Sequence, residues 1–213
     1  MDEKGDLARA MSNLKEKEVD ALVRQKLDAG VPATEILSQC REGLADAGRR
    51  FQEGEYYIPE LMYAGVLMKK VVDVLKPVLK GSPVPEGEAG TVVIGTVHRD
   101  IHDIGKDIVV LMLRGSGFQV IDLGVDVPPE KFAEAVEKND AIVVGMSVFL
   151  TSCCKSIAET VEAIKEAGLR ERVTIMIGGA AASDVVSERT GCDYYGETAV
   201  DAVSHASKAA RSR

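Results

Sequence analysis

Residues 91–113 read TVVIGTVHRDIHDIGKDIVVLML, and this stretch decides the fold. The apolar run at 92–97 predicts a buried β-strand, and the run at 106–113 predicts a helix that ends near Gly115. The turn between them, DIHDIG at 100–105, carries an imidazole, two carboxylates and a glycine. In open α/β sheets, ligands bind at the carboxyl ends of the strands, where such turns lie. The sequence therefore predicts a binding site in this turn.

Strand-like and helix-like segments alternate from this stretch onward. Strands are predicted at 91–97, 118–122, 141–146, 173–177 and, from a weaker pattern, 193–195. Helices are predicted at 105–115, 128–138, 153–167, 182–190 and 198–210, with a disordered tail after Ala209. This alternation predicts an α/β fold: a doubly wound, five-stranded parallel sheet of flavodoxin-like (Rossmann-type) order, with right-handed crossovers.

Two further segments follow predicted strands at the same structural level as DIHDIG. Ser147 follows the apolar run at 141–146, and Gly178-Gly179 follow the run at 174–177. In the strand order 2-1-3-4-5, the first, third and fourth strands are neighbours. If the sheet has this order, three separate pieces of sequence meet at one crevice.

The first 80 residues show helical spacing and no convincing strand. Apolar residues at helical spacing predict a leading helix at 6–14 and a second helix that Gly30 ends. Thr34 is expected to cap the next helix, and Pro59 suits the first turn of the last one. Residues 1–80 are therefore predicted to form a four-helix bundle cap domain. The stretch 81–90, rich in glycine and proline, is predicted to be a linker to an α/β domain at 91–213.

The composition limits the classes of partner. The chain has 213 residues, 46% of them hydrophobic, and a formal net charge of −8, which argues against nucleic acid as the main partner. No apolar stretch is long enough to cross a membrane, and the charged amino terminus lacks the apolar core of a secretion signal. A cytoplasmic protein is expected. The four cysteines match no zinc pattern and are expected to be reduced thiols.

The motif and its spacings carry a family resemblance. DIHDIG fits the pattern D-x-H-x-x-G, Ser147 and Phe149 stand at the S-x-L positions, and a paired glycine follows. This series resembles the corrinoid-binding domains of cobalamin-dependent methyltransferases and mutases, including the cobalamin-binding module of methionine synthase. The segment FQEGEYYIPEL at 51–61 is similar to the helical cap of methyl-carrying corrinoid proteins. The chain as a whole resembles the small corrinoid proteins of methylamine, methanol and methoxyarene methyltransferase systems.

His102 is the candidate metal ligand. A neutral imidazole binds a transition metal through one ring nitrogen while the other donates to a carboxylate, and Asp100 is the natural acceptor. The resemblance implies that His102 binds cobalt in place of the cofactor's own base, and that Asp100 and Ser147 continue a hydrogen-bonded relay. The remaining candidate contacts to the cofactor are Asp103, Ile104, Gly105, Phe149, Thr151, Gly178, Gly179 and Tyr195.

Several of these assignments have structural alternatives. Asp103, Ile104 and Gly105 also suit an ordinary helix start, whose free N–H groups attract a phosphate or amide. A zinc site with His98 and His102 lacks an evident third ligand, and its spacing falls at a strand end. In the helical domain, Tyr56, Tyr57, Leu61 and Met62 either shield the methyl face of the cofactor or form the core of the bundle.

Two residues depart from the family pattern. Phe149 stands where the family usually has leucine, and it can still supply an apolar wall. Arg99 stands where methyltransferase members often have glycine, and it adds a cation near the relay. Arg99 therefore either shifts the His102–Asp100 pair or forms a salt bridge to a partner.

The resemblance implies a protein that carries a methyl group on the cobalt of cobalamin or a related corrinoid. One partner would be a substrate-specific methyltransferase, another would pass the methyl group to tetrahydrofolate or coenzyme M, and a third would be a reductive activating protein. A catalytic barrel of about 250 residues does not fit in this chain, which predicts a subunit without catalytic activity of its own. The alternatives are a cobalamin-sensing regulator, disfavoured because no basic recognition helix is present, and the small subunit of a mutase.

Overall fold

The computed structural model describes residues 5–79 and 89–212. The chain divides into two compact units, Met1–Pro85 and Glu86–Arg213, which are described separately below. The predicted linker at 81–90 lies outside the described residues except for its last two positions. Within the described ranges, no helix combines the length and the apolar character that a bilayer crossing requires.

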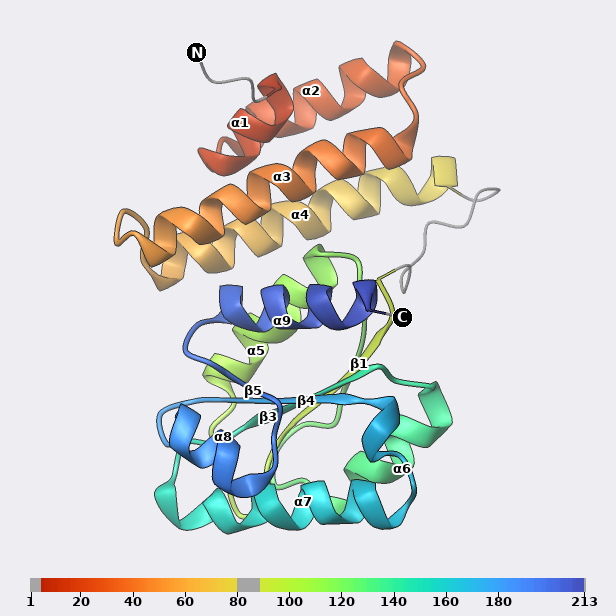
Figure 1. Cartoon of the computed structure of the whole chain (residues 1–213). Helices are drawn as coiled ribbons and strands as arrows, with labels where there is room; N and C mark the ends of the chain where they lie inside the picture. The colour runs from red at the N-terminus through yellow and green to blue at the C-terminus, as the bar shows by residue number, and fades with distance from the viewer. Residues whose placement is uncertain (1–4, 80–88, 213) are drawn as a thin grey trace. The chain divides into compact units, whose positions relative to one another are not determined.

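The first unit is helical, as predicted (Figure 1). Its helices are α1 (Asp6–Ser12), α2 (Glu16–Asp28), α3 (Ala33–Gln52) and α4 (Ile58–Leu79). Its core consists of apolar side chains that recur at helical spacing, among them Leu7, Met11, Val23, Ile36, Leu44, Leu61, Leu67, Met68 and Leu75. Pro59 stands in the first turn of α4, as expected.

The start of α3 differs from the prediction. Pro32, and not Thr34, occupies the N-cap position, and no side chain caps the helix. The Pro32 carbonyl accepts hydrogen bonds from the N–H groups of Glu35 and Ile36. Because the proline ring fixes φ near the helical value, Pro32 sets the entry of the chain without a capping hydroxyl.

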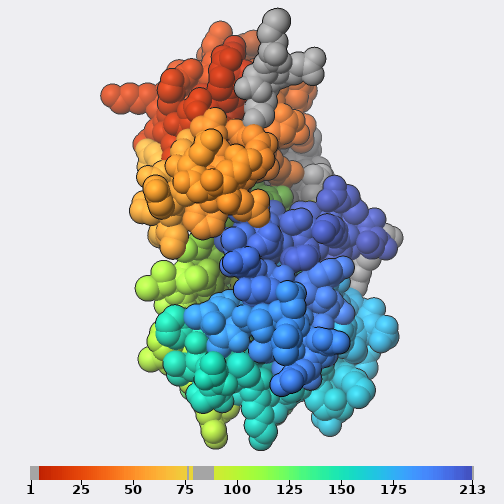
Figure 2. Space-filling view, turned by 60° about the vertical axis from the view of Figure 1, so that its left-hand side comes forward, coloured from red at the N-terminus to blue at the C-terminus, as the bar shows by residue number. Residues whose placement is uncertain are grey.

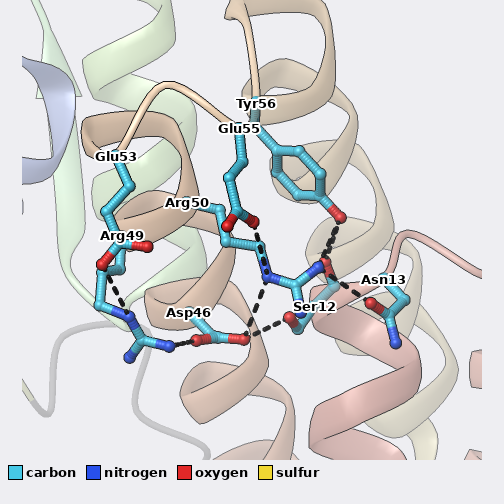
Figure 3. Close-up of polar contacts among 8 residues, drawn as sticks. All are labelled: Ser12, Asn13, Asp46, Arg49, Arg50, Glu53, Glu55 and Tyr56. Atoms are coloured by element: carbon cyan, nitrogen blue, oxygen red, sulfur yellow. Dashed lines mark hydrogen bonds and ion pairs between the residues drawn. The ribbon is translucent and has the colours of Figure 1, made fainter.

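A buried carboxylate links two helices of this unit (Figure 3). Asp46 on α3 is 3% exposed, and it accepts a hydrogen bond from the buried Ser12 hydroxyl at the end of α1. Arg49 bonds to the other carboxylate oxygen, and the Arg50 Nε lies 3.7 Å from the oxygen that Ser12 reaches. Burial of Asp46 is thus matched by one hydroxyl donor and two cations.

Arg50 extends these contacts to the turn before α4. Its Nη1 donates to the Asn13 side chain at 2.9 Å and to the Tyr56 hydroxyl at 3.1 Å. The Tyr56 hydroxyl in turn donates to the Ser12 carbonyl at 2.8 Å. The contacts in Figure 3 therefore hold the end of α1, the end of α3 and the α3–α4 turn in one arrangement.

The second unit is a five-stranded parallel sheet in the order β2-β1-β3-β4-β5, as predicted. Its strands are β1 (Thr91–Thr96), β2 (Gln119–Asp122), β3 (Val143–Ser147), β4 (Thr174–Gly178) and β5 (Tyr194–Gly196). The register pairs Thr96 with Ser147 and Ser147 with Gly178. The carboxyl ends of β1, β3 and β4 therefore lie side by side, which confirms the expected convergence.

Helices cover both faces of this sheet (Figure 1). They are α5 (Ile104–Gly115), α6 (Pro129–Asn139), α7 (Cys154–Glu166), α8 (Asp184–Thr190) and α9 (Ala199–Arg211), with 3₁₀ turns at Thr151–Cys153 and Arg170–Arg172. Side chains of β1 alternate between the faces: Val92 and Ile94 pack with α5 and α9, and Val93 packs with α6 and α7.

The carboxyl end of the chain is more ordered than predicted. The weakly predicted strand is present as β5, which pairs with β4. The expected disorder after Ala209 is wrong at the next two residues, because α9 continues to Arg211. Ala209 and Ala210 pack against the apolar cluster between α5, α9 and the sheet, and this burial favours the helical conformation.

A left-handed residue shapes the connection between β1 and α5. Arg99 has φ 67°, and Asp126, on the loop after β2, has φ 52°. Such a conformation costs a residue with a side chain roughly 1–2 kcal/mol. The Arg99 N–H donates to the Asp126 carboxylate at 2.7 Å, the Asp126 N–H donates to the Asp100 carbonyl at 2.9 Å, and the His98 ring lies 2.8 Å from the same carboxylate. Asp126 therefore holds the connection in this shape.

Replacement of Asp126 by asparagine tests this clamp. The N–H of Arg99 holds the pKa of the Asp126 carboxyl below its usual range, against a smaller opposing effect of desolvation, and His98 and Arg99 add favourable charge. A lowered folded-state pKa contributes stability above the unfolded pKa of about 4, and this contribution is lost as the pH falls. Asp126→Asn should therefore be less stable than wild type at neutral pH, and the difference should shrink on acidification. Urea unfolding of both proteins, from neutral pH down through the unfolded pKa, measures this difference in the free energy of unfolding. A difference that does not change with pH would contradict the role of the Asp126 carboxylate.

Removal of the Asp46 carboxylate should destabilise the helical unit. Asp46→Ala leaves the buried Ser12 hydroxyl without its acceptor and separates two arginines from their shared anion. The expected loss in the free energy of unfolding is about 1–3 kcal/mol. Asp20→Ala is the matched control, because Asp20 pairs with Arg24 on the exposed face of α2. Unfolding followed by circular dichroism should leave the control close to wild type, and equal losses in both variants would contradict the importance of burial.

Candidate functional site

The candidate site is built around Asp100, whose side chain is fully buried beyond the end of β1. One carboxylate oxygen accepts the His102 N–H at 3.1 Å and lies 2.7 Å from the His102 Nδ1. The other accepts the N–H groups of Phe149 at 2.6 Å and Leu150 at 3.1 Å, which follow β3. Asp100 therefore joins the loop after β1 to the loop after β3.

These contacts decide the charge of Asp100. Burial by itself raises the pKa of this carboxyl, but the bonds from Phe149, His102 and Leu150 together outweigh burial and lower it. Asp100 is thus a carboxylate that can only accept hydrogen bonds. The proton between the two groups belongs to the His102 Nδ1, and a neutral imidazole then carries its lone pair on Nε2.

The His102 side chain reaches the surface of the protein. The side chain is 45% exposed, and no hydrogen bond to Nε2 occurs among the residues that the structure describes. One face of the ring stacks on Phe149, with centroids 4.2 Å apart and an angle of 22° between the planes. This arrangement leaves a metal-binding nitrogen available, with its partner nitrogen held by a carboxylate.

The two histidines near the site belong to different contacts. His98 lies against Asp126, and His102 lies against Asp100. Within residues 5–79 and 89–212, no three His, Cys, Asp or Glu side chains come together in a group that could hold a metal. The structure therefore gives no support to a zinc site shared by His98 and His102.

The loop from Ile101 to Gly105 presents apolar and open surface. Ile101 is 70% exposed and Ile104 is 77% exposed. A Cβ at Gly105 would meet no atom within 4 Å, so the space beside this glycine is open. Asp103 occupies the N-cap position of α5 without a side-chain cap bond, and the Thr96 hydroxyl donates to the His102 carbonyl at 3.2 Å. The loop therefore presents exposed apolar surface and open space next to His102.

A buried lysine fixes the start of α5. Lys106 is 3% exposed, and its Nζ donates to Asp122 at the end of β2 and to Asp107. Burial alone lowers the pKa of Lys106, but these two carboxylates outweigh it and raise the pKa, so the side chain stays charged. The loop that carries His102 is therefore anchored at its far end as well as at Asp126.

Ser147 lies at the expected place but outside the observed relay. It is the last residue of β3. In the described parts of the chain, its hydroxyl bonds to neither Asp100 nor His102, and the backbone N–H groups of Phe149 and Leu150 reach Asp100 instead. Sequence reasoning missed these donors because every residue except proline carries an N–H. The role of Ser147 in the relay stays a prediction.

The glycine pair ends β4 beside the site. Gly179 has φ 111°, and a Cβ there would lie 2.3 Å from the Val148 carbonyl oxygen. Glycine is thus required by the close approach of the Val148 main chain, and contact of Gly178 and Gly179 with a cofactor stays a prediction. The nearest atom to a Cβ at Gly178 would be the Gly196 carbonyl oxygen, at 3.2 Å.

The other predicted contacts lie around the same end of the sheet. Thr151 is exposed at the start of a 3₁₀ turn, and Tyr195 on β5 is half-buried beside Ile177. In the space-filling view, yellow-green atoms of the loop after β1 meet teal atoms of the segment after β3 at the surface (Figure 2). One further contact was not predictable from the residue pattern: the Cys153 thiol donates to the Arg99 carbonyl at 3.4 Å.

The structure divides the four predicted residues of the helical unit. Leu61 is buried in the core, and Tyr56 takes part in the contacts of Figure 3. Tyr57 is 69% exposed and Met62 is 43% exposed, beside the exposed Ile58. Leu61 and Tyr56 are therefore structural, whereas Tyr57 and Met62 are available to a ligand or partner.

Comparison with known proteins shows the family to which the chain belongs. A B12 binding domain model matches residues 90–204, and a second B12 binding domain model matches residues 4–76. The trimethylamine corrinoid protein 1 of Methanosarcina acetivorans is 34% identical over 92% of this chain and 91% of its own length. The dimethylamine corrinoid protein 3 of the same organism is 38% identical over 90% and 89%.

Solved structures show the same likeness. A cobalamin-binding protein from Desulfitobacterium hafniense has a TM-score of 0.83 at 35% identity, with 95% of this chain and 96% of that chain covered. A chain of the methanol:cobalamin methyltransferase complex MtaBC from Methanosarcina barkeri has a TM-score of 0.82 at 27% identity, with 98% and 79% covered. The chain therefore belongs to the B12-binding family, in the group that contains the methylamine corrinoid proteins.

Proposed function

We propose that this protein is a methyl-carrying corrinoid protein in which His102 is the protein ligand to cobalt. The observation that carries the proposal is the His102 imidazole, held at Nδ1 by a buried carboxylate and open at Nε2. The names of the related proteins, which are corrinoid proteins of trimethylamine and dimethylamine systems, support the same assignment.

The residues of the site suit a corrinoid. His102 would hold the metal through Nε2, and the exposed Ile101, Ile104 and Phe149 offer apolar surface to a large macrocycle. The open side of Gly105 at the start of α5 would admit the polar arm of the cofactor near free N–H groups. When bound, the corrinoid would supply a cobalt that accepts and releases a methyl group.

Asp100 would determine where a proton is held on the His102 ring. When Nε2 holds the metal, Nδ1–H donates to the Asp100 carboxylate and keeps the ring oriented. Without a metal, Nε2 would be open to a proton, and the buried Asp100 carboxylate would lie beside the ring. The Asp100–His102 pair would thus orient Nε2 toward a metal and also hold a proton when that nitrogen is free.

The proposal includes partners and a setting. A substrate-specific methyltransferase would load the methyl group, a second methyltransferase would pass it to tetrahydrofolate or coenzyme M, and a reductive activating protein would restore the oxidised cofactor. The likeness to a chain from a methanol:cobalamin methyltransferase complex supports the first of these. We place this activity in the cytoplasm, and protection of the methyl group by Tyr57 and Met62 remains a prediction.

Electron paramagnetic resonance of the protein reconstituted with cob(II)alamin tests the proposal. Wild type should show nitrogen splitting, and growth on heavy-nitrogen histidine should change the triplet to a doublet, because the ligand is then a protein imidazole. His102→Ala should lose the isotope effect and weaken binding by more than the roughly 10–100-fold typical for loss of a ligand's hydrogen-bond partner.

His98→Gln is the matched control for this experiment. His98 lies on the same connection but contacts Asp126, so this variant should retain the isotope-sensitive splitting of wild type. If the nitrogen splitting of wild type does not change with labelled histidine, cobalt is bound by the cofactor's own base and not by a protein histidine. A His102→Ala variant with unchanged spectrum and affinity would likewise remove His102 from this role.

A further inference from the structure

We propose that Phe149 is a positioning residue that holds the His102 imidazole ready for its metal before the cofactor binds. The inference rests on the proposed function and gives Phe149, already part of the same site, a second role. Its basis is the stacked contact between the two rings, 4.2 Å apart and 22° from parallel.

Two restraints act on the imidazole, and they act in different directions. The bond between His102 Nδ1 and Asp100, 2.7 Å long, fixes one edge of the ring. A hydrogen bond at a single atom still allows the ring to turn about that bond. The Phe149 ring lies on the imidazole face and blocks this rotation on one side. The edge contact with Asp100 and the face contact with Phe149 therefore together fix the direction in which Nε2 points.

Phe149 also acts on the imidazole through its main chain. The Phe149 N–H donates to Asp100 Oδ2 at 2.6 Å, while Asp100 Oδ1 faces His102. The ring and the N–H of Phe149 thus act on the imidazole by separate routes, one direct and one through the carboxylate. Because the N–H is independent of the side chain, substitution of Phe149 removes the face contact and keeps the carboxylate contact.

Burial in the core does not explain why residue 149 is a phenylalanine. Its side chain is 49% exposed, and it belongs to neither of the two core clusters of the α/β unit. A leucine at this position would supply apolar surface but no flat face for an imidazole. Aromatic pairs contribute beyond the area that they bury, to an extent equivalent to roughly two- to tenfold in an equilibrium constant. Phe149 should therefore strengthen cofactor binding by orienting His102, and not only by contact.

The first test uses the protein without cofactor. Nuclear magnetic resonance of wild type should show the ring protons of His102 shifted upfield by the Phe149 ring current. Phe149→Leu should abolish this shift, and Phe149→Tyr, which keeps an aromatic face, should preserve it. Tyr194→Leu is the matched control: Tyr194 stacks on His205 at 4.3 Å and 19° in the same unit. This control should move the His205 signals and leave those of His102 in place.

The second test adds hydroxocobalamin to the same set of proteins. Phe149→Leu should bind roughly two- to tenfold more weakly and show a smaller histidine-coordinated fraction, whereas Phe149→Tyr and Tyr194→Leu should match wild type. A Phe149→Leu variant with wild-type affinity and coordination would overturn the inference, even if its His102 signals move. Failure of wild type itself to bind would overturn the proposed function and this inference together, so the two failures are distinguishable.

Discussion

The buried carboxylate of Asp100 is the interaction on which the site depends. An ionised group without contact to water is costly unless hydrogen bonds replace its hydration. Here the replacement comes from two loops that are far apart in sequence: His102 on one side, and the N–H groups of Phe149 and Leu150 on the other. The charge that orients the imidazole therefore also joins the ends of β1 and β3. Loss of this one group would release the imidazole and the junction between the loops together.

The surrounding scaffold keeps this carboxylate in position. The connection after β1 passes through a left-handed arginine, a conformation that the Asp126 side chain stabilises through the main-chain N–H of Arg99. Arg99 is exposed, and its main-chain N–H and carbonyl make the contacts to Asp126 and Cys153. At the other end of the loop, Lys106 fastens α5 to Asp122. Supports on both sides therefore hold the loop that carries His102 in one position.

The helical unit uses the same physical device for a different purpose. Asp46 is buried like Asp100, but its partners are a hydroxyl and two arginines, and the result is a fixed turn between α3 and α4. Tyr57 and Met62 follow that turn and remain exposed. Side chains that served only the core of the unit would be buried. Exposed apolar side chains beside a fixed turn instead suit contact with a ligand or partner.

The sequence by itself determined the fold class, the strand order and the location of the site. Alternating apolar periods predict strands and helices, and the motif DIHDIG places His102 and Asp100 at a strand end. It also determined the family, because the motif and its spacings are local features of the chain. The sequence did not determine which groups each of these side chains contacts. Apart from the His102 ring, the donors to Asp100 are main-chain N–H groups, which look alike at every position. Asp126 and Phe149 meet the loop only through the register of the sheet. Contacts of this kind depend on the distance between segments in space, and only the tertiary structure decides that distance.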